Sequence, residues 1–208
     1  MVYPERLHEA IAKVQDTVLV CPPVISQIAA VATAELTDAN LGYHPVGDRI
    51  VVNPPNFSKL GSLGRRVVIT HEVTHVATRT ASGPAAPTWL VEGFADYIGY
   101  RGVRVPYSVS ASELRDAVRS GHAPPVLPTD HDFDGANTDL AKVYEEAWLA
   151  VQLIVREHGR DGLVRFYRTV GRADAPSTAV NDAFRSLWHT DLATFTTEWH
   201  HDLQTRLA

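Results

Sequence analysis

The sequence has a single cysteine, Cys21, and no run of lysine and arginine. One cysteine excludes an internal disulfide bond and every cysteine-rich zinc module. The formal net charge is −5. Because a protein that binds the phosphate backbone needs clustered positive charge, nucleic acid is not an expected partner.

Long hydrophobic runs are also missing from the sequence. No stretch reaches the ~18 apolar residues of a membrane-spanning helix, and the opening MVYPERLHEA lacks the apolar core of a secretory signal. We therefore expect no membrane span. The expected location is the cytoplasm, or that of a secreted or anchored protein whose leader has been trimmed.

Hydrophobic periodicity divides the chain into a mixed first part and a helical second part. DRIVVNP (48–54) is the clearest strand, because it is β-branched at its centre and followed by proline. From residue 62 onward apolar residues recur mostly at helical spacing. The predicted fold class is α+β, a single domain over 1–208. Its parts are a small mixed α/β N-terminal lobe, 1–82, and a mostly helical C-terminal lobe, 83–208.

Smaller signals add elements and boundaries to this outline. ERLHEAIAKVQD predicts a further helix, and TVLVC and AAVATAELT predict two further strands. The turn GPAAP (83–87) separates two helices, and Gly159 is a predicted helix stop. Thr88 is a predicted N-cap, while Ser110 and Glu113 have the spacing of a capping box.

The segment VVITHEVTHVATR (67–79) places His71 and His75 four residues apart, with Glu72 directly after the first. Residues i and i+4 of a helix project from the same face, so both imidazoles can reach one zinc ion at roughly 2.0–2.1 Å. Glu72 lies beside that axis, where its carboxylate can take a proton from a water on the metal without binding the metal. The motif also arises by chance, with all three side chains hydrated on a helix surface.

A catalytic zinc needs a third protein ligand, and Glu92 in WLVEGFADY is the candidate. The GPAAP turn allows its helix to fold back against the preceding one. Asp96, one turn further on, can accept the free N–H of a ligating histidine, preferentially His71. The alternative is an ordinary hydrated face. Because the segment is mostly apolar, two carboxylates in it favour a bound cation.

HEVTH followed by WLVEGFADY resembles the gluzincin clan of zinc metallopeptidases. The wording WL-x-EGFA is especially similar to its peptidase-MA-like and M1-type branches. The resemblance is specific over residues 66–100 and looser from residue 140 to the end. The GxMEN segment of M1 aminopeptidases is absent, so the resemblance does not imply exopeptidase action.

The resemblance implies a single zincin-like domain, a role for each matching residue and the hydrolysis of peptide bonds. It makes His71, His75 and Glu92 the zinc ligands and Glu72 the general base and acid. Asp96 becomes the residue that accepts the N–H of a ligating histidine. Tyr144, in VYEEAW, resembles the clan's catalytic tyrosine, which donates to the tetrahedral intermediate. A core tyrosine at the start of a helix explains it equally well.

Two other groups of polar residues are weaker candidates. The oxyanion donor could instead be a histidine, although each of these is more typical of a surface or a helix end: His158, His189, His200 and His201. DHDFDG (130–135) matches the first half of a calcium loop, D-x-D-x-D-G. The twelfth position of that loop is Ala141 where a glutamate is needed, so a polar loop is favoured.

The leading hypothesis is a zinc-dependent peptidase that acts on peptide or protein substrates through a zinc-activated water and a glutamate base. One alternative is a peptide-modifying hydrolase dedicated to one partner. Another is a zinc-binding interaction or scaffold domain without turnover. Glu72 together with only three ligands favours an open, catalytic site. Substrate preference, endopeptidase or exopeptidase action and oligomeric state are not given by the sequence.

Overall fold

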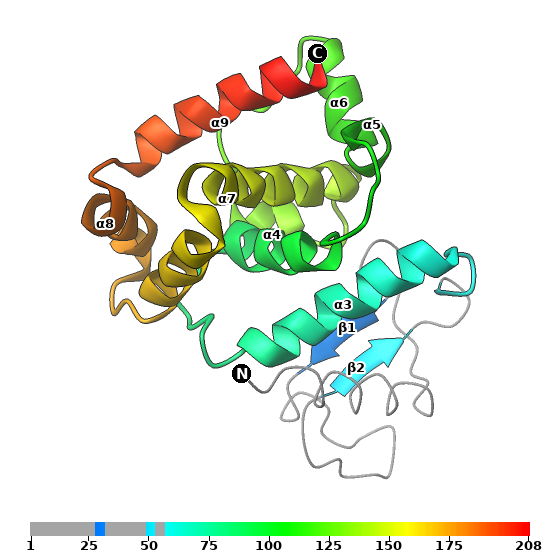
Figure 1. Cartoon of the computed structure of the whole chain (residues 1–208), viewed down its shortest axis with the longest axis horizontal. Coiled ribbons are helices and arrows are strands. Elements are labelled where there is room, and N and C mark those ends of the chain that lie inside the picture. Colours follow the sequence, from blue (N-terminus) through cyan, green and yellow to red (C-terminus); the bar gives the residue numbers. More distant parts are fainter. Residues whose placement is uncertain (1–27, 32–48, 53–56) are drawn as a thin grey trace. The chain divides into compact units, whose positions relative to one another are not determined.

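The computed structural model describes residues 28–31, 49–52 and 57–208, and these residues are mostly helical. Figure 1 shows the helices and strands. The chain divides into two compact units, Met1–Ala77 and Thr78–Ala208. The boundary lies close to the predicted division between the two lobes. The single zincin-like domain stays a prediction.

The first unit holds two short strands and most of one long helix. β1 (Ile28–Val31) pairs antiparallel with β2 (Arg49–Val52), with Ile28 opposite Val52. α3 spans Ser62–Thr78. β2 lies within the strand predicted from DRIVVNP. β1 covers only the start of AAVATAELT, and the predictions for ERLHEAIAKVQD and TVLVC fall outside the described residues.

The predicted α+β class with a mixed N-terminal lobe is wrong, because the protein is mostly helical. Among the residues that the structure describes, the strands are β1 and β2 alone, each four residues long. A two-stranded sheet of this size buries too little to form a structural layer of its own. The helical periodicity that begins near residue 62 covers a far larger part of the chain than the short β-branched segments do.

A small apolar cluster joins β2 to one face of α3. Its buried members are Ile50 and Val73, and the partly buried side chains around them are Phe57, Val68, Ile69 and Val76. Ile69, Val73 and Val76 recur at i, i+4 and i+7, the spacing of one helix face. His71 is two residues from both Ile69 and Val73, so it projects from the opposite side of α3.

The second unit is built around one long helix. Its elements are α4 (Thr88–Gly99), α5 (Tyr107–Ser110), α6 (Ser112–Arg119), the 3-10 helix η1 (Asp130–Phe133), α7 (Leu140–Gly171), α8 (Pro176–Trp188) and α9 (Leu192–Leu207). α7 packs against α4, α6, α8, α9 and η1, and Figure 1 shows α4 lying along it. Within the described ranges, the helices are too short or too polar to cross a membrane.

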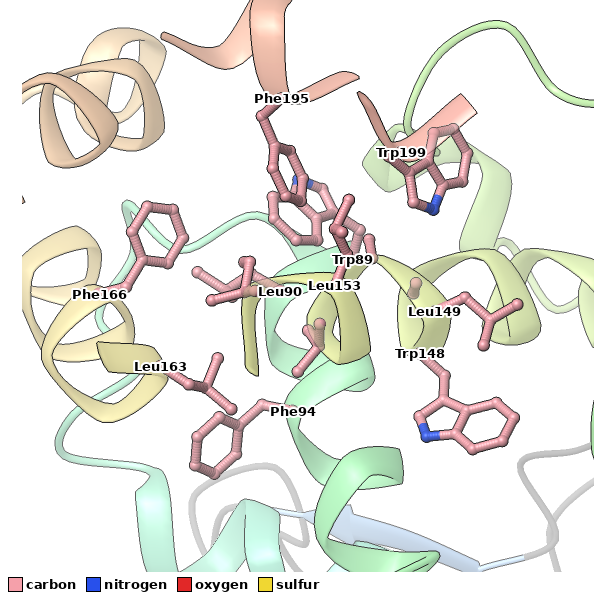
Figure 2. Packing of buried hydrophobic residues seen from close by; sticks show 14 of the residues in the cluster. Trp89, Leu90, Phe94, Trp148, Leu149, Leu153, Leu163, Phe166, Phe195 and Trp199 are labelled. Carbon is pink, nitrogen blue, oxygen red and sulfur yellow. The ribbon is translucent and has the colours of Figure 1, made fainter. Parts of the chain in front are cut away.

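The core of this unit consists of large apolar side chains directed at α7. Figure 2 shows residues of α4 and α9 converging on Leu149 and Leu153 of α7. The sequence predicts one apolar stripe along α7, formed by Leu140, Val143, Ala147, Val151, Ile154 and Val155. This stripe is confirmed, since its members are buried with the exception of the half-buried Val155. In α9 the sequence predicts a second apolar face from residues spaced three, four and four apart, Leu192, Phe195, Trp199 and Leu203. The last three are buried and Leu192 is half-buried.

Gly159 interrupts α7 as the sequence predicts. Its φ of 71° and ψ of 175° are not helical, so the backbone changes direction there and a second helix follows without a loop. A positive φ is accessible to glycine at little steric cost. A residue with a β-carbon would be strained at this position.

Two predicted helix caps are wrong. The N-cap of α4 is Pro87, and Thr88 is the first helical residue instead. Ser110 does not form a capping box, because its hydroxyl donates to the carbonyl of Pro106 and Ala111 occupies the N-cap of α6. In both helices a carboxylate distant in the sequence accepts a first-turn N–H, which local patterns do not reveal.

α4 and α7 approach each other backbone to backbone at Gly93. A β-carbon added there would lie 2.3 Å from the carbonyl oxygen of Ala147 and 2.8 Å from Cγ2 of Val151. A backbone oxygen cannot yield as a flexible side chain can. Gly93 therefore sets how closely the helix that carries Glu92 packs against α7.

Gly93→Ala should lower the free energy of unfolding by about 1–3 kcal/mol, because the added methyl group forces α4 and α7 apart. Chemical denaturation monitored by far-UV circular dichroism measures this change. Gly135→Ala is the control, since nothing lies within 4 Å of a β-carbon there. Equal unfolding midpoints for the two variants would contradict the close-packing argument.

Candidate metal centre

His71 and His75 direct the same ring nitrogen to one point. Their Nε2 atoms lie 2.9 Å apart, and the ring planes are inclined by 79°. The four-residue spacing on α3 produces this arrangement, because it brings the two side chains onto one face. His71 is buried and His75 half-buried. Two imidazole lone pairs directed at one point suit a shared cation.

Glu72 is buried beside this histidine pair, with only 5% of its surface exposed. A carboxylate so far from water requires a hydrogen-bond donor or a cation nearby. Glu72 is thus the buried acid of α3 that directly adjoins a ligand candidate.

The structure brings the three predicted ligands together. One ligand atom from each of His71, His75 and Glu92 lies within 4.8 Å of the others, so the group could hold a metal ion. In the described part of the chain, this is the one group of three or more metal-binding side chains. Two imidazole nitrogens and one carboxylate oxygen form a donor set that fits zinc.

Glu92 and Asp96 lie one turn apart on α4 and are both half-buried. Their neighbours Leu90, Phe94 and Ala95 are buried in the core. Burial raises the pKa of Tyr100 to about 12, and the negative charge of Asp96 adds to the effect. Asp96 thus lies near the end of a helix that is otherwise largely apolar. Its predicted hydrogen bond to a ligating histidine stays a prediction.

Tyr144 lies in the first turns of α7 and is half-buried. Its ring meets that of Phe133 edge to face, with centroids 5.3 Å apart. This contact with η1 restricts the ring and is compatible with both interpretations of Tyr144. Its role as an oxyanion donor stays a prediction.

The four alternative donors have contacts of their own within the second unit. His158 stacks on Trp188 at a centroid distance of 3.7 Å, and burial lowers its pKa. Nδ1 of His200 lies 2.8 Å from the carbonyl oxygen of Pro124. His189 forms the C-cap of α8, and His201 is exposed on α9. These contacts match the surface and helix-end positions expected of them.

Comparisons of the chain with protein-family models, curated proteins and solved structures find no match. The gluzincin resemblance therefore rests on the two sequence motifs alone.

The DHDFDG segment forms a 3-10 turn whose carboxylates accept hydrogen bonds from the backbone. Asp132 accepts from the backbone N–H of Thr129 at 2.7 Å, and Asp134 accepts from that of Ala136 at 2.8 Å. Asp130 accepts from the N–H of Thr88 at 2.8 Å. These bonds favour the polar-loop interpretation over a calcium loop.

Sequence reasoning missed a pair of coupled carboxyl groups beside Tyr144. Glu145 of α7 accepts the N–H of Leu114 at 2.7 Å, at the start of α6, and is hydrogen-bonded to Glu113. Burial, together with the bond to Glu113, raises the pKa of Glu145 to about 8. The same bond lowers the pKa of Glu113. Glu145 therefore keeps its proton at neutral pH and donates it to Glu113.

A second acid with a raised pKa follows directly in the sequence. Glu146 has 5% of its surface exposed, and burial raises its pKa to about 7. The signal for both was present in VYEEAW, where two acidic residues interrupt an otherwise apolar helix pattern. Periodicity does not reveal which of the two is buried, because this helix is packed on several sides.

Between the ordinary glutamate pKa of 4.5 and about 8, the folded protein holds a proton on Glu145 that the unfolded chain has released. The free energy of unfolding should therefore fall as the pH rises through this range. Glu145→Gln imitates the protonated acid and cannot ionise. Its unfolding midpoint should decline less steeply than that of the wild type, as urea titrations between pH 5 and 9 would measure.

The exposed Asp116→Asn is the control for this prediction and should keep the wild-type slope. Glu113→Gln is the complementary variant, because its amide can donate to an ionised Glu145. That variant should move the loss of stability to lower pH. Parallel curves for wild type and Glu145→Gln would show that Glu145 has no raised pKa.

Proposed function

We propose that this protein is a zinc-dependent peptidase of the gluzincin type. The observation that supports this most is the group of His71, His75 and Glu92, with the buried Glu72 next to the first histidine. Three protein ligands leave a coordination position free for water and substrate, as catalytic zinc sites do. A structural zinc site closes its fourth position and has no use for an adjacent buried acid.

In this proposal the residues divide the chemical work among themselves. His71, His75 and Glu92 hold the ion. When bound, zinc supplies a Lewis acid that polarises the scissile carbonyl group and activates water. Glu72 takes the proton from the attacking water and passes it to the leaving amine. Its burial keeps bulk water from competing for that proton.

Two further residues complete the proposed mechanism. Asp96 accepts the free N–H of His71, which selects the tautomer whose other nitrogen faces the ion. The hydroxyl of Tyr144 donates a hydrogen bond to the oxyanion as it develops. The substrate is a peptide or a protein. A hydrolase dedicated to one partner would use the same residues, and a scaffold domain would need only the ligands.

Wild-type protein should bind one zinc ion per chain, and His75→Ala should lose stoichiometric zinc because it removes one of three ligands. Metal analysis after dialysis against metal-free buffer measures both. His201→Ala is the control, since that histidine is exposed on α9. Stoichiometric zinc in His75→Ala would reject the ligand assignment.

Glu72→Gln should keep its zinc and its fold but lose ~10²–10⁴-fold in turnover, because the amide cannot accept the proton. Turnover of peptides from a mixed library, with zinc content measured in parallel, tests this. Tyr144→Phe serves as a comparison that removes a single hydroxyl, with a loss of roughly 10²–10³-fold if it donates to the oxyanion.

The exposed Glu198→Gln is the matched control for Glu72→Gln and should turn over at the wild-type rate. Wild-type turnover in Glu72→Gln would show that the proposed mechanism is wrong. If zinc-loaded wild type cleaves nothing across a broad peptide library, the scaffold function replaces the peptidase.

A further inference from the structure

The N-terminus of α4 is capped by a residue from a distant part of the chain. Pro87 occupies the N-cap and has no side-chain hydrogen bond to offer. Oδ1 of Asp130 instead accepts the N–H of Thr88 at 2.8 Å, across 42 positions of sequence. A carboxylate at this end of a helix also interacts favourably with the helix dipole. Asp130 therefore satisfies a first-turn donor that the local sequence leaves open.

Glu92 lies one helical turn after Thr88, so it depends on how firmly that first turn is held. Helices fray from their ends. The N–H groups of Leu90 and Val91 both bond to the carbonyl of Pro87, next to the residue that Asp130 contacts. Loss of the cap would loosen the turn on which Glu92 stands.

Asp130 can cap α4 reliably because hydrogen bonds fix the conformation of η1. Asp132 accepts hydrogen bonds from both the N–H and the hydroxyl of Thr129, each at 2.7 Å. Asn137 donates its side-chain amide to the carbonyl of Asp132 at 2.7 Å. The neighbouring Phe133 packs edge-on against Tyr144. η1 thus contacts the helix that carries Glu92 and the helix that carries Tyr144.

We propose that η1 is a positioning element of the metal centre, and that Asp130 is the positioning residue for Glu92. The inference rests on the proposed function, because it assigns Glu92 to the ion. Asp130 itself touches neither the ion nor the substrate. It orients Glu92 through the backbone of α4, so that less ligand reorganisation is needed when the ion binds.

Three variants separate this role from general stability. Asp130→Ala removes the acceptor, Asp130→Asn keeps an oxygen acceptor of the same size, and Asp134→Ala removes a carboxylate that accepts within its own turn. We expect Asp130→Ala to bind zinc roughly 10-fold more weakly in competition with a chelator, a loss typical of supporting residues around metal sites. Asp130→Asn and Asp134→Ala should match the wild type.

Two further measurements report on geometry without turnover. The visible absorption of the Co²⁺-loaded protein should change in Asp130→Ala, because a displaced Glu92 alters the ligand field, and should be restored in Asp130→Asn. Hydrogen exchange of the metal-free protein should accelerate at Thr88, Leu90 and Val91 in Asp130→Ala only.

The outcomes distinguish this inference from the proposed function. If wild type binds neither Zn²⁺ nor Co²⁺, the proposed function fails and the inference with it. If wild type binds both ions and Asp130→Ala keeps the wild-type affinity and spectrum, the inference alone is overturned. Should Asp130→Ala not fold, Asp132→Ala is tested instead, because it removes the two hydrogen bonds to Thr129 that hold η1 and keeps the Asp130 side chain. Unchanged affinity and spectrum there would also reject the inference.

Discussion

The second unit depends on the close packing of α4 against α7. At Gly93 the two backbones approach so closely that a β-carbon would overlap the carbonyl oxygen of Ala147. Interiors packed at this density respond to a single added methyl group. The adjacent Glu92 therefore stands on a helix whose distance from α7 is determined by the absence of a side chain. In the proposed function Glu92 benefits from this support as a metal ligand, because small displacements weaken coordination.

Carboxyl groups occur at several points of the chain beside apolar side chains. Glu145 donates its proton to Glu113, whereas the exposed Asp130 accepts a helix N–H. The bond between Glu145 and Glu113 removes part of the cost of placing an acid next to a hydrophobic core. In our proposal the carboxyl groups of Glu72 and Glu92 are compensated by a metal ion. Glu92 binds this ion together with the two histidines, and Glu72 lies beside it.

The histidine pair and its glutamate could be predicted from the sequence because the geometry is local. A helix puts i and i+4 on one face, so the Nε2 atoms of His71 and His75 meet whatever the rest of the chain does. The break at Gly159 and the buried stripe of α7 were predicted for the same reason. Glu92 required a further argument from the apolar residues around it, because helical spacing alone does not identify a ligand on another helix.

Tertiary structure decided what local patterns do not encode. The α+β class was wrong because short β-branched segments were taken to indicate a mixed α/β lobe, whereas the protein is mostly helical. The expected caps at Thr88 and Ser110 were wrong because the acceptors at those helix starts come from Asp130 and Glu145. The sequence by itself determined the candidate ligands and the helical spacing of the two histidines. Only the packing of distant segments determined which carboxylate caps a helix and which one keeps its proton, because these outcomes depend on burial and on partners far apart in the chain.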